Sequence, residues 1–158
     1  MADQLRLFSE PQVATSSDDY YTPKWVFDAL GEKFDLDVCA PTGGGPFVPT
    51  TRYFTQEDDG LSSEWSGFVW MNPPYSKPLP WVVKFLEHGD GIALMPTSNA
   101  RWLKLLWDGA SGWVPLPAMK FWTPSGIAKG TIPNQCWLVS AGTRGLEALH
   151  RSNFGKVR

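Results

Sequence analysis

The tetrapeptide Asn-Pro-Pro-Tyr at residues 72–75 is the stretch of this sequence best suited to chemistry. It directly follows the apolar run Phe68–Met71, which is typical of a buried β-strand. Open α/β sheets bind their ligands at the carboxyl ends of their strands, where such a turn would lie. Two proline rings restrict the backbone there and hold a carboxamide and a phenol in a fixed relation. The candidate catalytic residues are Asn72, Pro73, Pro74 and Tyr75.

The side-chain oxygen of Asn72 and the backbone carbonyl of Pro73 are two acceptors that a rigid turn can hold side by side. An amine attached to an aromatic ring is a poor nucleophile because its lone pair is delocalised into the ring. Hydrogen bonds from its two N–H groups to these acceptors would localise the lone pair and aim it at an electrophile. Such preorganised electrostatics needs no side chain with a shifted pKa. The Tyr75 ring could stack on the flat ring that carries the amine.

Two further segments precede this turn in a particular order, Tyr20–Pro23 (YYTP) and Phe34–Ala40 (FDLDVCA). Together with the turn they resemble the amino-group DNA methyltransferases that use S-adenosylmethionine, and most closely the small phage-type, Dam-like DNA N6-adenine methyltransferases. The resemblance covers residues 18–142, and its most specific element is the (D/N)PP(Y/F/W) motif. It implies a Rossmann-like α/β fold, S-adenosylmethionine as cofactor, and DNA with an adenine-containing target site as partner.

The resemblance also implies where the cofactor would bind. Asp37 would accept a hydrogen bond from the ammonium of the methionine moiety, and Asp59 would lie near the adenosine, with Asp58 as its competitor. The usual glycine-rich cofactor loop is replaced by residues 39–46 (CAPTGGGP), and its glycine run Gly43–Gly45 is interpreted as a flexible loop. The implied cofactor-binding residues are Tyr21, Thr22, Pro23, Asp37, Cys39, Ala40 and Asp59.

Charge is distributed unevenly along the chain, whose net charge is −2. Residues 1–66 hold 4 Lys/Arg against 12 Asp/Glu, whereas residues 67–158 hold 10 against 4. The basic half could contact phosphates, although such splits also arise on ordinary solvated surfaces. Lys84 and Lys104 belong to this basic set, and the loop 123–134 is a candidate for contacts with the target. The candidate nucleic-acid-binding residues are Lys77, Arg101, Lys120, Phe121, Trp122 and Lys129.

Hydrophobic periodicity and turn residues predict helices that alternate with short strands. Thr22 is predicted to cap a helix that begins at Pro23 and runs to Lys33. Two more helices are expected near 80–88 and at 99–108, the latter with Trp107 on its apolar face. Strands are expected at 34–38, 51–55, 67–71, 91–95, 113–116, 120–122 and 136–140.

This alternation predicts a mostly parallel sheet with helices on both faces. The last two strands are expected to form an antiparallel hairpin at the C-terminal end of the sheet. Residues 1–17 are expected to be a flexible N-terminal arm, residues 18–142 the methyltransferase domain, and residues 143–158 a basic C-terminal helix or tail.

At 158 residues and 42% hydrophobic composition, the chain is long enough for one domain with its own core. No apolar run approaches the length of a membrane span, and the first residues lack a signal-peptide core. The expected location is therefore the cytoplasm of a bacterium or of a phage-infected host cell. Cys39 and Cys136 lie far apart without a CxxC motif, so we expect reduced thiols and no metal site. His88 and His150 are interpreted as surface residues, and the chain as a monomer or weak dimer.

Three other functions stay open. A protein glutamine N5-methyltransferase also uses this motif on a planar nitrogen, but that family carries an N-terminal helical domain and a glycine-rich first motif that are missing here. An RNA adenine N6-methyltransferase would need the same pocket for a flipped base. A catalytically silent nucleic-acid-binding module would require a decayed cofactor site, and the intact Asn-Pro-Pro-Tyr motif argues against decay.

Overall fold

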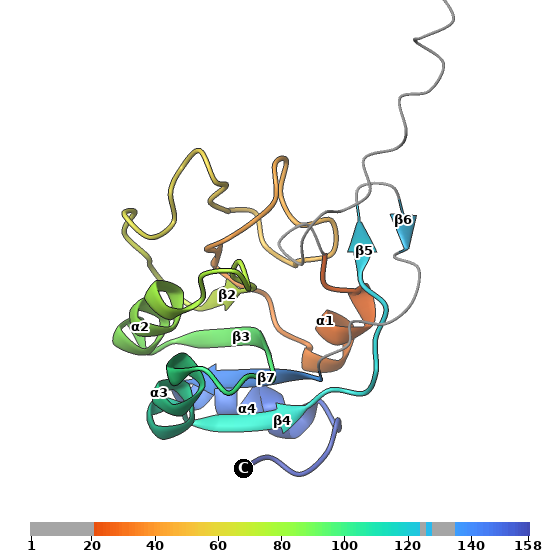
Figure 1. The fold of residues 1–158 in the computed structure, drawn as a ribbon. Coiled ribbons are helices and arrows are strands. Elements are labelled where there is room, and N and C mark those ends of the chain that lie inside the picture. The colour runs from red at the N-terminus through yellow and green to blue at the C-terminus, as the bar shows by residue number, and fades with distance from the viewer. Residues whose placement is uncertain (1–20, 124–125, 128–134) are drawn as a thin grey trace, which may run out of the picture.

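The strand that leads into the Asn-Pro-Pro-Tyr turn lies inside a five-stranded sheet (Figure 1). The computed structural model describes residues 21–123, 126–127 and 135–158. The helices are α1 (Lys24–Leu30), α2 (Leu79–His88), α3 (Arg101–Gly109) and α4 (Thr143–Arg151). The strands are β1 (Leu36–Asp37), β2 (Val69–Met71), β3 (Gly91–Pro96), β4 (Gly112–Pro115), β5 (Trp122–Thr123), β6 (Gly126–Ile127) and β7 (Cys136–Ala141). The arm predicted for residues 1–17 lies outside the described residues.

The five strands follow the order β1-β2-β3-β7-β4. Strands β1, β2 and β3 are parallel, and β7 runs antiparallel between β3 and β4. Figure 1 shows β2, β3, β7 and β4 one above the other, with the β5–β6 pair apart from them. Four of the five strands therefore point the same way, and the sheet is mixed.

The predicted hairpin between residues 120–122 and 136–140 is wrong. β5 pairs with β6, and β7 pairs with the long strand β3 on one side and with β4 on the other. The reason is burial: of the six residues of β7, only Trp137 is not buried. A strand this apolar belongs in the centre of a sheet, where both of its faces are covered.

Helices cover both faces of the sheet, as predicted. Along β2 the side chains alternate between the two faces: Trp70 packs in one core cluster with residues of α1 and α4, while Val69 and Met71 pack in the other with residues of α2 and α3. Trp107, predicted on the apolar face of α3, is instead 53% exposed. Among the described residues, no helix has both the length and the apolarity needed to cross a membrane.

Two local predictions near the N-terminus need correction. Helix α1 begins at Lys24 with Pro23 as its N-cap, and it makes no side-chain capping hydrogen bond. It ends at Leu30, because Gly31 adopts a left-handed conformation with φ of 64° that stops the helix. Thr22 is therefore not the cap; its side chain is buried and turned toward Asn72.

The segment 51–55, predicted as a strand, forms only a single bridge with the sheet, between Tyr53 and Asp37. It still runs along the outer edge of β1, because the N–H of Asp37 donates to the Arg52 carbonyl (3.0 Å) and the N–H of Phe54 donates to the Asp37 carbonyl (2.9 Å). The loops on either side of this segment therefore lie over the carboxyl end of β1, where they build a pocket.

Candidate active site

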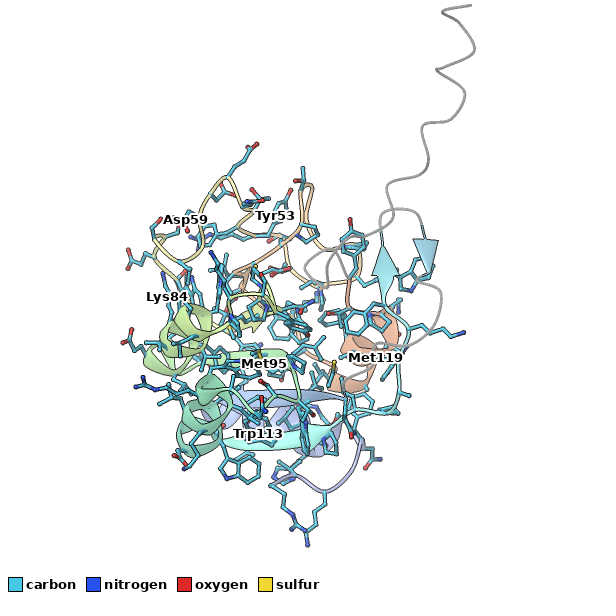
Figure 2. The ribbon with its side chains drawn as sticks, viewed as in Figure 1. Tyr53, Asp59, Lys84, Met95, Trp113 and Met119 are labelled. Atoms are coloured by element: carbon cyan, nitrogen blue, oxygen red, sulfur yellow. The ribbon has the colours of Figure 1, made fainter. Side chains whose placement is uncertain are left out.

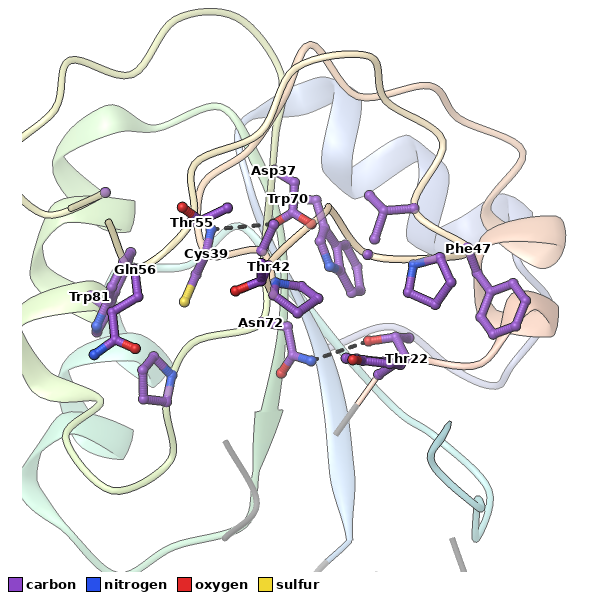
Figure 3. A pocket seen from close by; sticks show the side chains of 18 of the residues that line it. Thr22, Asp37, Cys39, Thr42, Phe47, Thr55, Gln56, Trp70, Asn72 and Trp81 are labelled. Carbon is purple, nitrogen blue, oxygen red and sulfur yellow. Dashed lines mark hydrogen bonds between the residues drawn. The ribbon is translucent and has the colours of Figure 1, made fainter. Parts of the chain in front are cut away.

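A cavity of about 500 Å³ lies at the carboxyl ends of β1 and β2 (Figure 3). Its walls come from the segment before α1, the loops after β1, the turn after β2 and the first turn of α2. The lining residues are Tyr21, Thr22, Asp37, Cys39, Ala40, Pro41, Thr42, Gly45, Pro46, Phe47, Val48, Thr55, Gln56, Asp59, Gly60, Trp70, Asn72, Pro74 and Trp81. The three segments singled out in the sequence thus meet at one cavity, as expected for the carboxyl edge of parallel strands.

Asp37 is the buried carboxylate of this cavity, with 2% of its surface exposed. Burial raises its pKa from 3.8 to about 7, and the backbone N–H of Cys39, which donates to Oδ1 (3.2 Å), offsets this only in part. Within the part of the chain that the structure describes, no cation forms an ion pair with it. A buried carboxylate without a cationic neighbour favours a ligand that brings a positive charge.

The glycine run in the loop after β1 allows close backbone packing around Asp37. A Cβ atom on Gly44, which has φ of +89°, would lie 3.0 Å from the Tyr53 ring. A Cβ on Gly45 would lie 2.8 Å from Val48 and 3.4 Å from Asp37 Oδ2. Gly44 and Gly45 thus let this loop pack closely, Gly44 against Tyr53 and Gly45 beside the carboxylate, whereas a Cβ on Gly43 would meet nothing within 4 Å. That the run is a flexible loop stays a prediction.

Gly60 has a similar role in the second loop over the cavity, and sequence reasoning missed it. A Cβ atom at this position would come within 2.1 Å of the Val38 carbonyl, so only glycine lets this loop cross the end of β1. The neighbouring Asp59 lines the cavity. Asp58 does not line it, and its carboxylate accepts hydrogen bonds from the N–H (2.8 Å) and hydroxyl (3.0 Å) of Thr55. The arrangement favours Asp59 over Asp58 as the residue that faces a ligand.

Lys84 was considered with the basic residues that could meet phosphates, but it holds this loop in place. From α2 its Nζ donates to the backbone carbonyls of Gly60 (3.1 Å), Leu61 (2.8 Å) and Ser63. Figure 2 shows Lys84 below the loop that carries Asp59. Its charge also lies 5.0 Å from the centre of the Trp65 ring. Lys84 is therefore engaged inside the molecule rather than presented to a phosphate.

Replacing Lys84 with methionine should lower the free energy of unfolding by about 1–3 kcal/mol, because three carbonyls lose a charged donor. The loop would then hold Asp59 less firmly, so ligand affinity should fall while the salt dependence of DNA binding stays the same. Thermal unfolding and DNA titrations at several salt concentrations measure both effects. Lys104→Met is the matched control for stability, since among the described residues the ion pair of Lys104 is the exposed one with Asp108 on α3. Equal stability of the two variants would contradict this role.

Asn72 and Pro74 of the Asn-Pro-Pro-Tyr turn line the cavity, whereas Pro73 and Tyr75 do not. The Asn72 side-chain nitrogen Nδ2 donates to Thr22 Oγ1 (3.3 Å), which joins two segments 50 residues apart. The Tyr75 hydroxyl donates to the Leu94 carbonyl on β3 (3.2 Å), and burial raises its pKa well above the usual value. The turn is thus anchored at both ends.

The residues predicted to bind the cofactor mostly gather at the cavity: Tyr21, Thr22, Asp37, Cys39, Ala40 and Asp59 line it, and Pro23 does not. Sequence reasoning missed the aromatic walls, which come from Phe47, Trp70 and Trp81. No local signal distinguishes these from ordinary core residues, because their exposure to the cavity depends on how distant loops fold over the sheet.

The residues predicted to bind nucleic acid are more scattered. Lys77, Arg101 and Lys120 are exposed. Phe121 is only 1% exposed and belongs to the core, so the prediction that it binds nucleic acid is wrong. Lys129 and most of the loop 123–134 lie outside the described residues.

Trp122 lies close to the cavity. It is partly buried, and its ring meets Phe47 edge to face with 5.3 Å between the ring centres. Its backbone pairs with Tyr21, with hydrogen bonds of 2.6 Å and 3.0 Å. Since Phe47 and Tyr21 both line the cavity, Trp122 stands at its rim. The described residues hold no group of three or more His, Cys, Asp or Glu side chains that could bind a metal ion.

Comparison with known proteins gives two matches. The family described as DNA N-6-adenine-methyltransferase (Dam) matches residues 11–100. A curated relative, the "DNA N-6-adenine-methyltransferase" of Haemophilus phage HP1 (strain HP1c1), is 39% identical over 78 residues, which are 46% of this chain and 43% of the relative. The match thus spans less than half of that relative. No solved structure matches the chain significantly.

Proposed function

The chain belongs to the DNA N-6-adenine-methyltransferase (Dam) family, and we propose that it transfers a methyl group from S-adenosylmethionine to the N6 amino group of adenine at specific sites in DNA. The observation that carries this proposal is that Asn72 of the Asn-Pro-Pro-Tyr turn lines the same cavity as the buried carboxylate Asp37. A donor with a cationic group and a planar amine could therefore meet there.

We also propose that the fold is a Rossmann-like methyltransferase fold. Three adjacent parallel strands with helices on both faces support this assignment, as does the position of the cavity at the carboxyl ends of two of them. The antiparallel strand β7 makes the sheet mixed. The matched range, residues 11–100, contains every catalytic and cofactor-binding candidate named above.

The cavity suits S-adenosylmethionine in charge and size. Asp37 would accept a hydrogen bond from the ammonium of the methionine moiety, because it is buried and lacks a cationic neighbour among the described residues. A volume of about 500 Å³ lies in the range typical of small-molecule sites. When bound, the cofactor supplies a methyl group on a positively charged sulfur. Asp59 would face the adenosine, and Tyr21, Thr22, Cys39 and Ala40 would line the remaining surface.

The turn would act on the amine. Asn72 Oδ1 and the Pro73 carbonyl would accept hydrogen bonds from the two N–H groups of N6, and Pro74 keeps the turn rigid. Methyl transfer would form the bond from N6 to the methyl carbon and break the bond from that carbon to sulfur, and the amine would then release a proton to water. Tyr75 would stack on the extruded base. Its hydroxyl bond to the Leu94 carbonyl would keep the ring in one orientation.

DNA would approach over the same edge of the molecule. Lys77, Arg101 and Lys120 are exposed and could contact phosphates, which would make the affinity depend strongly on salt. Trp122 at the cavity rim could cover the second face of the flipped base. The chain is proposed to work as a monomer or weak dimer.

The decisive experiment supplies methyl-labelled S-adenosylmethionine together with DNA, RNA or a protein substrate, followed by digestion and mass analysis. We expect N6-methyladenine from DNA. Label in RNA adenine or in glutamine N5 would show that the proposed substrate is wrong, and so would cofactor binding without transfer to any of the three substrates. Absence of cofactor binding would indicate a catalytically silent module and would overturn the proposal as a whole.

A further inference from the structure

The hydrogen bond between Thr22 and Asn72 connects the segment before α1 with the turn after β2. Asn72 Nδ2 donates to Thr22 Oγ1 across 3.3 Å. Figure 3 shows this bond as a dashed line, with the side-chain oxygen of Asn72 directed away from Thr22. Both residues line the cavity, and Thr22 is buried, with 5% of its surface exposed.

The orientation of this carboxamide matters for the proposed reaction. Its two ends have opposite properties, because the oxygen only accepts hydrogen bonds and the NH₂ group only donates them. The terminal torsion of an asparagine side chain is broad and nearly two-fold, so the side chain itself does not choose between the two orientations. If the NH₂ end faced the substrate, a donor would meet the N–H groups of the amine and the lone pair would not be localised.

We propose that Thr22 is a positioning residue: by holding the NH₂ end of Asn72, it sets the carboxamide so that Oδ1 faces the target amine. This inference rests on the proposed function. It assigns to Thr22 a role in the chemical step, distinct from the contact with the cofactor that the sequence predicted.

Thr22 is suited to this role because its own position is fixed. On one side, the backbone of Tyr21 pairs with Trp122 through two hydrogen bonds of 2.6 Å and 3.0 Å. On the other side, the ring of Pro23 restricts the backbone, and the Pro23 carbonyl accepts from the N–H of Val26 (3.2 Å). The β-branched threonine side chain has few rotamers of its own. The acceptor oxygen is therefore held in place before any substrate arrives.

The backbone of Asn72 is held by the strand that precedes it and by the two prolines that follow it. It follows β2, whose last residue Met71 is in register with Ala93 of β3. Two prolines come after it and restrict the backbone of the turn. The bond to Thr22 restricts the rotation of the Asn72 side chain. Helix capping does not compete for the hydroxyl, because the start of α1 has no side-chain capping bond.

The first test replaces Thr22 with valine, which has nearly the same shape but no acceptor, and with serine, which keeps the acceptor. Thr22→Val should lower kcat for DNA methylation by about 3- to 10-fold, the range that one neutral hydrogen bond supplies, with the Kd for S-adenosylmethionine within 2-fold of wild type, roughly the loss that a few tenths of a kcal/mol represents. Thr22→Ser should recover most of the loss. Thr143→Val, on the exposed start of α4, is the matched control.

A double-mutant cycle separates positioning from packing. In the Asn72→Asp background the carboxylate presents an oxygen in either orientation, so Thr22→Val should cost far less there than in the wild type. An equal loss in both backgrounds would overturn the inference, and so would a loss confined to the Kd for the cofactor, because Thr22 would then act by packing or by contacting the cofactor.

The side-chain NH₂ signals of Asn72 provide a readout that needs no turnover. In ¹⁵N-labelled protein these signals are identified by their loss in Asn72→Asp. We expect contacts between them and the Thr22 methyl group in the wild type, and a second set of signals, from the turned amide, in Thr22→Val. One unchanged set in Thr22→Val would overturn the inference. If wild-type protein methylates no DNA, the proposed function fails, while this measurement still decides whether Thr22 orients Asn72.

Discussion

Replacing Asn72 with alanine should lower the rate of methyl transfer to DNA adenine by about 10²- to 10³-fold, the loss seen when one preorganised hydrogen-bonding group is removed from an active site. The amine would keep one acceptor, the Pro73 carbonyl, and its lone pair would stay largely delocalised. The Asn72 side chain is hydrogen-bonded to Thr22 rather than to Asp37, so cofactor affinity should change little. Single-turnover rates with labelled cofactor, together with calorimetric binding, measure the two effects separately.

Asn99→Ala is the control for this prediction, because Asn99 is an exposed asparagine in the loop after β3 and lies outside the cavity. It should leave transfer unchanged. Asn72→Asp should keep measurable turnover, since a carboxylate oxygen can also accept from the amine. Wild-type rates in a folded Asn72→Ala variant would exclude the role proposed for the turn.

Most of the fold that positions this turn follows from local sequence patterns. The helices α2 and α3 and the strands β2, β3 and β7 were predicted within a few residues, because long apolar runs and 3.6-residue periodicity depend only on neighbouring residues. The placement of β7 could not be predicted, since strand order is decided by burial across the whole sheet. The predicted hairpin failed for this reason.

The candidate site likewise contains residues that local sequence patterns predict and residues whose positions depend on how distant loops fold. Asp37 and Asn72 were predicted because Asp37 lies at the end of one recognisable strand and Asn72 directly follows another, and parallel strands bring their carboxyl ends together. The positions of Gly44, Gly45 and Gly60 against Tyr53, Val48 and the Val38 carbonyl depend on loops folding back over β1, which no periodicity reports. These glycines let the backbone pass close to the cavity without a shared sequence pattern.

Charged residues were the least predictable part. Lys84 and Lys77 look alike in the sequence, yet Lys84 donates to three loop carbonyls whereas Lys77 is exposed. A lysine reaches several ångströms from its backbone, so its partner depends on which loop folds above it. Composition therefore shows that the second half of the chain is basic, but not which of its cations are available to phosphates.

Lowering the pH from 7.5 to 5.5 should weaken S-adenosylmethionine binding by roughly 20-fold, because the Asp37 carboxyl must be ionised to hold an ammonium and its pKa is about 7 in the unliganded protein. The ammonium itself stays mostly protonated over this range. Binding should therefore release protons near pH 6. Calorimetric titrations in buffers of different ionisation enthalpy measure the affinity and the number of protons released.

In the unliganded protein, the contribution of Asp37 to the free energy of unfolding should rise as the pH falls, whereas the affinity for the cofactor should fall. Burial raises the pKa of Asp37 from 3.8 to about 7, so its contribution to stability is fully present below pH 3.8 and is lost as the pH rises through about 7.

Asp37→Asn should remove the pH dependence of both cofactor binding and stability, with weak binding that no longer varies between pH 5.5 and 7.5. Asp108→Asn, at an exposed carboxylate on α3, should keep them. If Asp37→Asn bound the cofactor as tightly as wild type at pH 7.5, the buried carboxylate could not be the partner of the ammonium, and the cofactor would have to lie elsewhere in the cavity.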